Sequence, residues 1–370
     1  MFTEFDQQMM RRALHLAALG RYTTHPNPRV GCVIVQGEHI VGEGWHRKWG
    51  ELHAEPLALA AADTAARGAT VYVTLEPHSY HGRTPPCTDA LIRAGVGRVI
   101  CAALDANPQV QGAGVRQLQA AGIDVQCGLL AAEAHELNAG FEKRMRHGMP
   151  RVIVKLAASL DGRVALANGA SQWITGPAAR SDVQQLRAAA SAVLTGIETV
   201  LHDDPRLTVR DPALDLAGRQ PLRVVLDSRL RMPAGARMLG EPGETWVFGA
   251  TAEQDKAAAL RARGAIVHVV RAGNSGGVDL TQVLQQLAQQ GCNDVLVEAG
   301  PTLAGQFFQQ RLVDELILYL APMLLGPQAR PMLQLPMLQQ LEAAPGLQLQ
   351  CSEQIGQDLK LILKCLGNAG

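Results

Sequence analysis

The chain has 370 residues, of which 47% are hydrophobic and 18% are charged. A globular domain usually holds about 100 to 200 residues, so the length predicts two domains, and the balanced composition excludes a disordered chain. Lysine plus arginine and aspartate plus glutamate both number 34. The resulting net charge of zero argues against a nucleic-acid partner, because phosphate binding usually leaves a basic surplus.

The N-terminal segment has apolar residues at Met9, Leu14, Leu16 and Ala17, a spacing that predicts an amphipathic surface helix. The apolar stretch there, residues 13–19, is too short to span a bilayer and lacks the layout of a signal peptide. Elsewhere, every longer apolar stretch is interrupted by a charge or a proline. We therefore expect a cytoplasmic protein without a membrane partner.

The first half of the chain alternates short β-branched runs with alanine-rich segments that end in glycine. This pattern predicts βαβ units on a largely parallel sheet, and therefore an α/β fold. Strands are predicted at residues 29–36, 38–45, 70–75, 98–104 and 124–130, the first two as a hairpin, and helices at 54–68, 87–95, 115–122 and 133–148. Gly148 and Pro150 close this segment, which predicts a domain boundary between residues 148 and 149.

The second half repeats the α/β pattern from residue 149 to residue 370. It begins with the run 151–165, and further strands are predicted at 192–196, 221–228, 245–250, 265–270 and 294–300, with helices at 178–191, 280–290 and 302–311. The segments 316–326 and 347–366 are predicted to be closing strands. The apolar C-terminal strand either closes the sheet or pairs across a homodimer.

A metal-dependent hydrolytic site is indicated by His53 and Glu55, with Pro77 and Cys87 further along the chain. A hydrolytic deaminase needs a metal that makes hydroxide available near neutral pH and a carboxylate that moves protons. The His-x-Glu pair fits the first half of the zinc-deaminase signature, in which the glutamate is not a ligand. We expect this pair at a helix start that faces the next strand-to-helix turn, where Pro77 and Cys87 lie.

The same region resembles the deaminase domain of the bifunctional riboflavin-biosynthesis deaminase/reductases. The motifs shared in order with that family are THPNPRVGCVIV, GEGWH, HAE, VTLEP, HGRTPPC and DALI. The resemblance implies a cytidine-deaminase-like fold, with Glu55 as the catalytic residue and Asn27 in the substrate pocket. In that family two cysteines are separated by eight residues; here the second is Cys87, and His78 occupies the position of the first. The implied zinc ligands are therefore His53, His78 and Cys87.

Two residues depart from the family pattern. Zinc accepts imidazole and thiolate ligands together, so a zinc site that includes His78 is still plausible. The imidazole is neutral, however, where the cysteine thiolate of the family is anionic. Pro56 disfavours the α conformation of the residue before it, so Glu55 is expected at the helix cap instead of inside the helix. These departures motivate an alternative, in which the protein is only a reductase and its deaminase domain is structural.

Three further residues near these motifs have open roles. His46 and His81 either line the same pocket or are structural. Arg83 either contacts a substrate phosphate or braces its loop.

A phosphate-binding turn is indicated by Gly300 and Gly305, which follow a predicted strand and flank a helix start. The motifs KLAASLDGR, SQWITG, ETVLHDDPRLTVR, VVLDS and VEAGPTLAG surround it in order. They resemble the reductase domain of the same family, which is similar in fold to dihydrofolate reductase. The resemblance implies NADPH as the hydride donor.

The resemblance also implies the binding residues of this second domain. The implied cofactor residues are Ala157, Trp173, Thr199, Asp203, Ser228, Gly300, Pro301, Thr302, Leu303, Ala304, Gly305 and Gln306. The implied substrate residues are Ser171, Arg187, Leu207, Arg210 and Glu298. Guanidinium groups suit the ribose 5-phosphate of the substrate. Lys155 either assists opening of the sugar ring or forms a structural ion pair with Asp161.

Together these observations predict a bifunctional riboflavin-biosynthesis enzyme, with a zinc-dependent deaminase domain at residues 1–148 and an NADPH-dependent reductase domain at 149–370. The expected partner is a small phosphoribosyl pyrimidine, bound by a homo-oligomer, most simply a dimer. A deaminase relative that edits transfer RNA is a rival from another class; the neutral charge and the complete second domain oppose it.

Overall fold

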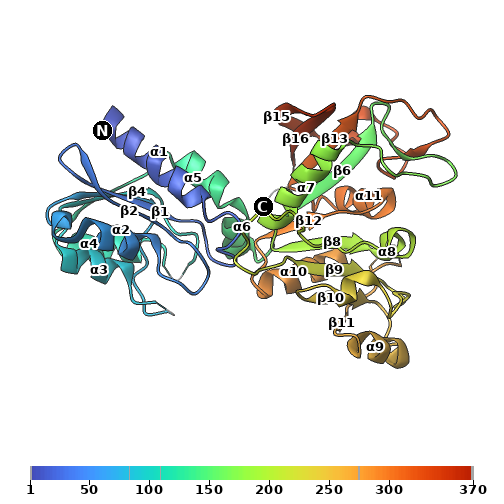
Figure 1. Cartoon of the computed structure of the whole chain (residues 1–370), viewed down its shortest axis with the longest axis horizontal. Helices are drawn as coiled ribbons and strands as arrows, with labels where there is room; N and C mark the ends of the chain where they lie inside the picture. Colours follow the sequence, from blue (N-terminus) through green and yellow to red (C-terminus); the bar gives the residue numbers. More distant parts are fainter. Residues whose placement is uncertain (1, 83, 109, 274–275, 368–370) are drawn as a thin grey trace. The chain divides into compact units, whose positions relative to one another are not determined.

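The computed structural model describes residues 2–82, 84–108, 110–273 and 276–367. The chain divides into two compact units, Met1–Gly148 and Met149–Gly370, and each is described by itself (Figure 1). Within the described residues, every helix is too short or too polar to cross a bilayer.

The N-terminal unit is built on a five-stranded sheet with the strand order β2-β1-β3-β4-β5. The strands are β1 (Gly31–Gln36), β2 (His39–Trp45), β3 (Thr70–Leu75), β4 (Arg98–Ala103) and β5 (Asp124–Cys127). The helices are α1 (Glu4–Ala18), α2 (Ala54–Ala62), α3 (Cys87–Ala94), α4 (Ala113–Ala120), α5 (Ala131–Leu137) and α6 (Ala139–His147).

Alternation along the strands gives this sheet two buried faces. Cys32 and Ile34 of β1 pack with α2, α3 and α4, whereas Val33 and Val35 pack with α1 and α5. Figure 1 shows the same two layers of helices on either side of the sheet. The hydrophobic core on each face of the sheet therefore holds these helices, and the residues at their ends, in fixed positions.

Two expectations for this unit need correction. The pairs β3–β4 and β4–β5 are parallel and β1–β2 is an antiparallel hairpin, all as predicted, but β1 is also antiparallel to β3, so only half of the sheet is parallel. The predicted helix 133–148 is two helices that meet at Asn138. The Asn138 side chain bonds both the N–H and the carbonyl of Arg29, at 2.8 and 2.9 Å, and this contact with a distant segment interrupts the helix.

The C-terminal unit is built on a nine-stranded sheet with the order β11-β10-β9-β8-β12-β6-β13-β16-β15, and β7 and β14 form a separate pair. The strands are β6 (Arg151–Ser159), β7 (Arg163–Ala165), β8 (Ala192–Gly196), β9 (Leu222–Leu226), β10 (Thr245–Gly249), β11 (Ile266–Val269), β12 (Asp294–Val297), β13 (Glu315–Ala321), β14 (Arg330–Pro331), β15 (Leu347–Ile355) and β16 (Asp358–Cys365). The helices are α7 (Pro177–Ala189), α8 (Ile197–Asp203), α9 (Gln254–Arg261), α10 (Leu280–Gln289) and α11 (Pro301–Gln309).

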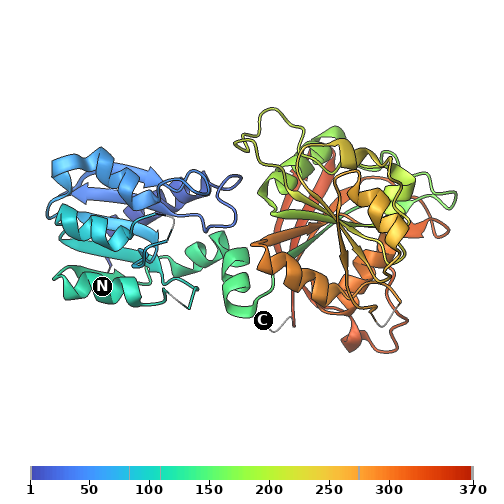
Figure 2. The same cartoon turned by 90° about the horizontal axis from the view of Figure 1, so that it is seen from below.

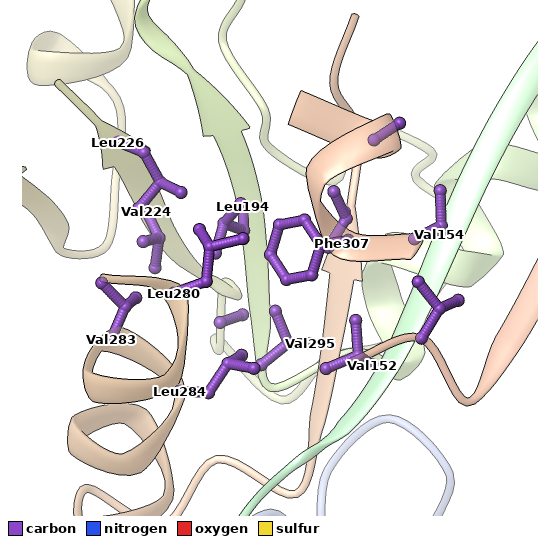
Figure 3. Packing of buried hydrophobic residues seen from close by; sticks show 14 of the residues in the cluster. Val152, Val154, Leu194, Val224, Leu226, Leu280, Val283, Leu284, Val295 and Phe307 are labelled. Atoms are coloured by element: carbon purple, nitrogen blue, oxygen red, sulfur yellow. The ribbon is translucent and has the colours of Figure 1, made fainter. Parts of the chain in front are cut away.

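Helices cover both faces of this sheet as well, as Figure 2 shows in a view along its strands. On one face, α10 and α11 pack on the strands, and Leu280, Val283 and Leu284 point toward Leu194 and Val295 (Figure 3). On the other face, α7, α8 and α9 cover the sheet. Strand β12 is buried along its whole length, which explains its continuous apolar run.

The C-terminal strand β16 is an inner strand of this sheet. Strand β16 pairs with β13 on one side and β15 on the other, so β15 lies at the sheet edge. Helices α8 and α9 were not predicted, because α8 has only seven residues and α9 has a weak apolar pattern. Helix α8 matters for function, since it follows β8 directly at the sheet edge described below.

Candidate active sites

The predicted deaminase residues meet at the ends of three elements. His53 directly precedes α2, His78 follows β3, and Cys87 is the first residue of α3. The Cys87 sulfur lies 3.1 Å from Nδ1 of His78 and 3.5 Å from Nδ1 of His53. Ligand atoms of all three residues lie within 4.8 Å of one another. The arrangement therefore directs two imidazoles and one sulfur toward a common point, as a single metal ion requires.

Glu55 lies beside this cluster and is 3% exposed. Burial raises the pKa of its carboxyl group, although the neighbouring Cys87 side chain acts in the opposite direction. Its Oε2 is buried without a hydrogen-bond partner among the described residues. A carboxyl group with a raised pKa and an unused oxygen is suited to carry a proton in both directions.

The expectation that Pro56 keeps Glu55 at the helix cap is wrong. His53 is the cap residue, α2 begins at Ala54, and Glu55 lies inside the first turn. Proline is tolerated there because the N–H groups of the first turn have no acceptor within the helix.

Asn27 and His46 lie next to the His53–His78–Cys87 group. Nδ2 of Asn27 is 3.1 Å from Nε2 of His46, and Nδ1 of His46 is 3.1 Å from the carbonyl oxygen of Leu52. Because a carbonyl only accepts, Nδ1 carries the proton and Nε2 accepts from Asn27. Burial lowers the pKa of His46, which fits this neutral ring. The His46 ring meets the His53 ring edge-on, with centroids 5.2 Å apart.

The remaining candidates lie in the segment between β3 and α3. His81 is exposed, and Arg83 lies outside the described residues. Thr84, which the sequence analysis did not single out, places its hydroxyl 3.4 Å from Nε2 of His53.

Glu76 holds the metal loop in place and was also not singled out. Its buried carboxylate accepts hydrogen bonds from the main-chain N–H groups of Asp105, Gly112, Gly114 and Val115, at 2.9 to 3.2 Å. These bonds tie the end of β3 to the start of α4 and so fix where the following Pro–His pair lies. The only sign of this role in the sequence was an acidic residue directly before the Pro–His pair.

The predicted reductase residues line a large pocket at the carboxyl ends of the parallel strands β6, β8, β9 and β12. Open α/β sheets bind ligands at this edge. The predicted cofactor residues that line it are Ala157, Trp173, Thr199, Asp203, Ser228, Gly300, Pro301, Thr302, Leu303 and Gln306. The predicted substrate residues Ser171, Arg187, Leu207, Arg210 and Glu298 line it too.

Two predicted cofactor residues lie away from this pocket. Ala304 is fully buried in the core, and Gly305 faces the main chain of Gln334, where an added Cβ would lie 2.1 Å from the carbonyl oxygen. Both belong to α11, whose successive residues point in different directions, so a continuous run cannot all face one ligand. Trp173 is 68% exposed at the pocket, which excludes a core-packing role.

A bidentate ion pair forms the centre of the pocket. Nε and Nη2 of Arg187, on α7, donate to both carboxylate oxygens of Glu298 at 2.6 and 2.9 Å, and the two side chains are only 11% and 13% exposed. Although burial opposes it, the Arg187 guanidinium holds the pKa of Glu298 below its usual range. Arg187 and Arg210 both donate to the carbonyl of Thr208, so the two guanidinium groups are neighbours.

Lys155 and Asp161 do not form the ion pair that was one of the two alternatives. Asp161 accepts from the Ser159 hydroxyl and from main-chain N–H groups of the loop after β13. Lys155 lines the pocket instead; burial lowers its pKa, and the Glu298 carboxylate acts in the opposite direction.

Comparison with known proteins identifies both units. The RibD C-terminal domain matches residues 150–361, and the cytidine and deoxycytidylate deaminase zinc-binding region matches residues 3–103. The riboflavin biosynthesis protein RibD of Escherichia coli is 52% identical over 97% of this chain and 99% of its own length. The chain belongs to the RibD family.

Solved structures of RibD proteins agree over the whole chain. Acinetobacter baumannii RibD is 45% identical, with a TM-score of 0.91 over 98% of this chain and 99% of its own. A diaminohydroxyphosphoribosylaminopyrimidine deaminase/5-amino-6-(5-phosphoribosylamino)uracil reductase from Thermotoga maritima is 30% identical, with a TM-score of 0.85 over 98% and 99%. The predicted fold class and the predicted riboflavin-biosynthesis deaminase/reductase are thereby confirmed, in preference to a reductase alone.

The reductase pocket of this RibD-family chain is more cationic than the sequence suggested. Among the described residues that line it, nine are cationic and three are acidic. The cationic residues are Lys155, Arg180, Arg187, Arg206, Arg210, Arg229, Arg231, Arg237 and Arg330, and the acidic ones are Glu198, Asp203 and Glu298. Most of these arginines gave no signal in the sequence, since an arginine outside a motif is usually a solvated surface charge.

Proposed function

We propose that residues 1–148 are a zinc-dependent deaminase domain and that residues 149–370 are an NADPH-dependent reductase domain acting on its product. The first would hydrolyse the 2-amino group of 2,5-diamino-6-(5-phosphoribosylamino)pyrimidin-4-one and release ammonia. The second would reduce the ribosyl side chain and give 5-amino-6-(5-phosphoribitylamino)uracil. Support comes from the Thermotoga maritima relative, whose name states both activities.

The observation that carries the deaminase proposal is the convergence of His53, His78 and Cys87 beside Glu55. Zinc accepts all three of these ligand types. The buried Oε2 of Glu55 has no hydrogen-bond partner among the described residues, which supports a site where a ligand or water supplies that partner. Bound zinc makes hydroxide available from water near neutral pH. Glu55 would take the proton from water at Oε2 and deliver it to the departing amine.

Substrate orientation in the first site is assigned to Asn27. His46 accepts from the Asn27 amide nitrogen, and that bond fixes the orientation of the amide group. The amide oxygen is then presented as an acceptor for an N–H group of the pyrimidine.

In the second site, NADPH supplies the hydride. The start of α11 at Gly300 and Pro301 offers main-chain N–H groups to the cofactor phosphates, and the exposed Trp173 offers a ring for stacking. Arg187 and Arg210 would hold the substrate phosphate, with Glu298 keeping the Arg187 fork in a fixed orientation.

Removing the metal with a chelator is expected to abolish ammonia release, while NADPH oxidation with the deaminated intermediate continues. The two activities should respond differently to metal removal because the His53–His78–Cys87 group lies within the N-terminal unit and the cationic pocket within the C-terminal unit. Both rates are measured on the same preparation, and zinc is then added back as the control. Ammonia release at the original rate from metal-free protein would contradict the proposal.

The reductase is expected to bind its two anionic ligands more weakly as salt is added. Nine cationic against three acidic lining residues concentrate positive charge at the pocket, and a Debye length of about 10 Å at 0.1 M salt screens such fields. KM for NADPH should rise severalfold between low and moderate salt, with a smaller rise for the less charged NADH. Equal KM values for NADPH at all salt concentrations would contradict an electrostatic contribution of these residues to cofactor binding.

A cytoplasmic location, the absence of a nucleic-acid partner and a homodimeric state remain predictions from the sequence.

A further inference from the structure

We propose that His78 makes the deaminase centre a single-thiolate metal site, which holds zinc less tightly and selects it less strictly against cobalt(II) than the same loop would with a second cysteine. The inference rests on the proposed function, in that the three ligands must hold a metal. It concerns which ion they prefer and how firmly they keep it.

The geometry makes Cys87 the one sulfur that both imidazoles share. Nδ1 of His78 lies 3.1 Å from the sulfur and Nδ1 of His53 lies 3.5 Å from it, while the two rings are inclined at 52° with centroids 4.5 Å apart. His78 therefore occupies a ligand position and does not merely stand near one. The donor set is two nitrogens and one sulfur.

This donor set differs in charge and softness from one with two cysteines. A divalent ion with two neutral imidazoles and one thiolate keeps a net positive charge, whereas a second thiolate would neutralise it. Thiolate ligands favour zinc, while imidazole also suits nickel, iron and other divalent ions. Each exchange of sulfur for nitrogen therefore reduces both the electrostatic attraction and the discrimination in favour of zinc.

The outer nitrogen of His78 also bears on how firmly the site holds its metal. A metal-binding histidine usually donates its second N–H to a fixed acceptor, and loss of that acceptor costs about 10- to 100-fold in metal affinity. Nε2 of His78 is buried and makes no hydrogen bond of good geometry among the described residues, although a main-chain group of Thr84 lies beside the ring. His53 is better supported, since Thr84 places a hydroxyl 3.4 Å from its Nε2.

The main chain around His78 is held independently of its side chain, which permits a matched comparison. The His78 carbonyl accepts from the main-chain N–H of Thr88 at 3.3 Å and from its hydroxyl at 3.5 Å. Glu76 anchors the preceding residues to the start of α4. A cysteine introduced at position 78 would therefore start from the same loop.

The test compares full-length wild type with His78→Cys and His78→Ala. Zinc and cobalt(II) dissociation constants are measured by competition with a chromophoric chelator, and thiolate-to-cobalt charge transfer is followed by absorption. We expect His78→Cys to bind zinc at least severalfold more tightly than wild type, to prefer zinc over cobalt more strongly, and to show about twice the charge-transfer intensity, because it adds a second thiolate. His78→Ala should bind both ions more weakly and lose one nitrogen donor without losing the sulfur band.

Two results would overturn the inference. One is the same zinc affinity and the same zinc-to-cobalt preference in wild type and His78→Cys. The other is a wild-type cobalt spectrum in His78→Ala, with circular dichroism confirming that the variant is folded. Failure of the proposed function is a separate outcome, in which the wild-type protein holds no metal even after zinc supplementation. If the wild-type protein instead holds zinc, deaminates, and prefers zinc over cobalt as strongly as His78→Cys does, only this inference is wrong.

Discussion

Replacing Glu55 with glutamine is expected to lower the rate of ammonia release by about 10²- to 10⁴-fold, the usual contribution of a general acid–base group. Glutamine has nearly the same shape, so α2 and the metal ligands should keep their places, but an amide cannot accept and return a proton. The raised pKa of the buried carboxyl group and its unpartnered Oε2 are what suit Glu55 to this role. NADPH oxidation with the deaminated intermediate should be unchanged.

The matched control for this experiment is Glu51→Gln. Glu51 lies four residues earlier in the same segment and is exposed, so its replacement removes the same charge without touching the ligand cluster. Zinc content should equal that of wild type in both variants. If Glu55→Gln releases ammonia at the wild-type rate with its zinc in place, another group moves the proton.

The second large effect is expected from Arg187→Ala. Removal of one partner leaves Glu298 as a buried charge, which costs about 3 kcal/mol even though Lys155 and Arg210 lie near that carboxylate. For a unit of this size such a loss lowers the melting temperature by about 10 °C. Reductase activity should fall as well, because the substrate phosphate would lose one of its two proposed guanidinium partners. Thermal unfolding and NADPH oxidation measure the two effects.

Two further variants separate stability from binding. Arg187→Lys keeps the charge but not the fork, so it should recover part of the stability while KM for the substrate stays high. Gln185→Ala, on the exposed side of α7 and away from the pocket, should change neither quantity. An Arg187→Ala protein that melts like wild type would show that the ion pair is unimportant for this unit.

The local parts of the site were accessible from the sequence. His53 and Glu55 are separated by one residue, and Cys87 opens the next helix, so short-range signals place each of them at a helix start. The same holds for Gly300 and Pro301 at the start of α11. Strand-to-helix turns at the carboxyl ends of parallel strands meet at a common edge, and the motifs mark those turns.

Contacts between distant segments were not accessible. Asn138 breaks a predicted helix because its amide finds Arg29, and Glu76 collects N–H groups from a loop almost 40 positions away. Periodicity reports which face of an element is buried, but it contains no information about the partner that covers it. For the same reason Ala304 and Gly305 belong to a cofactor motif and yet face the core and Gln334.

The sequence by itself determined the α/β class, the order of the elements, the family and the identity of the metal-ligand candidates, because these depend on residue types and short spacings. The tertiary structure decided that the candidate ligands His53, His78 and Cys87 lie close together, that Glu55 lies inside its helix, and that Arg187 pairs with Glu298 in place of solvent. It also gathered scattered arginines into one pocket. Distances, burial and hydrogen-bond partners depend on which elements pack together, and that is settled only when both cores form around their sheets.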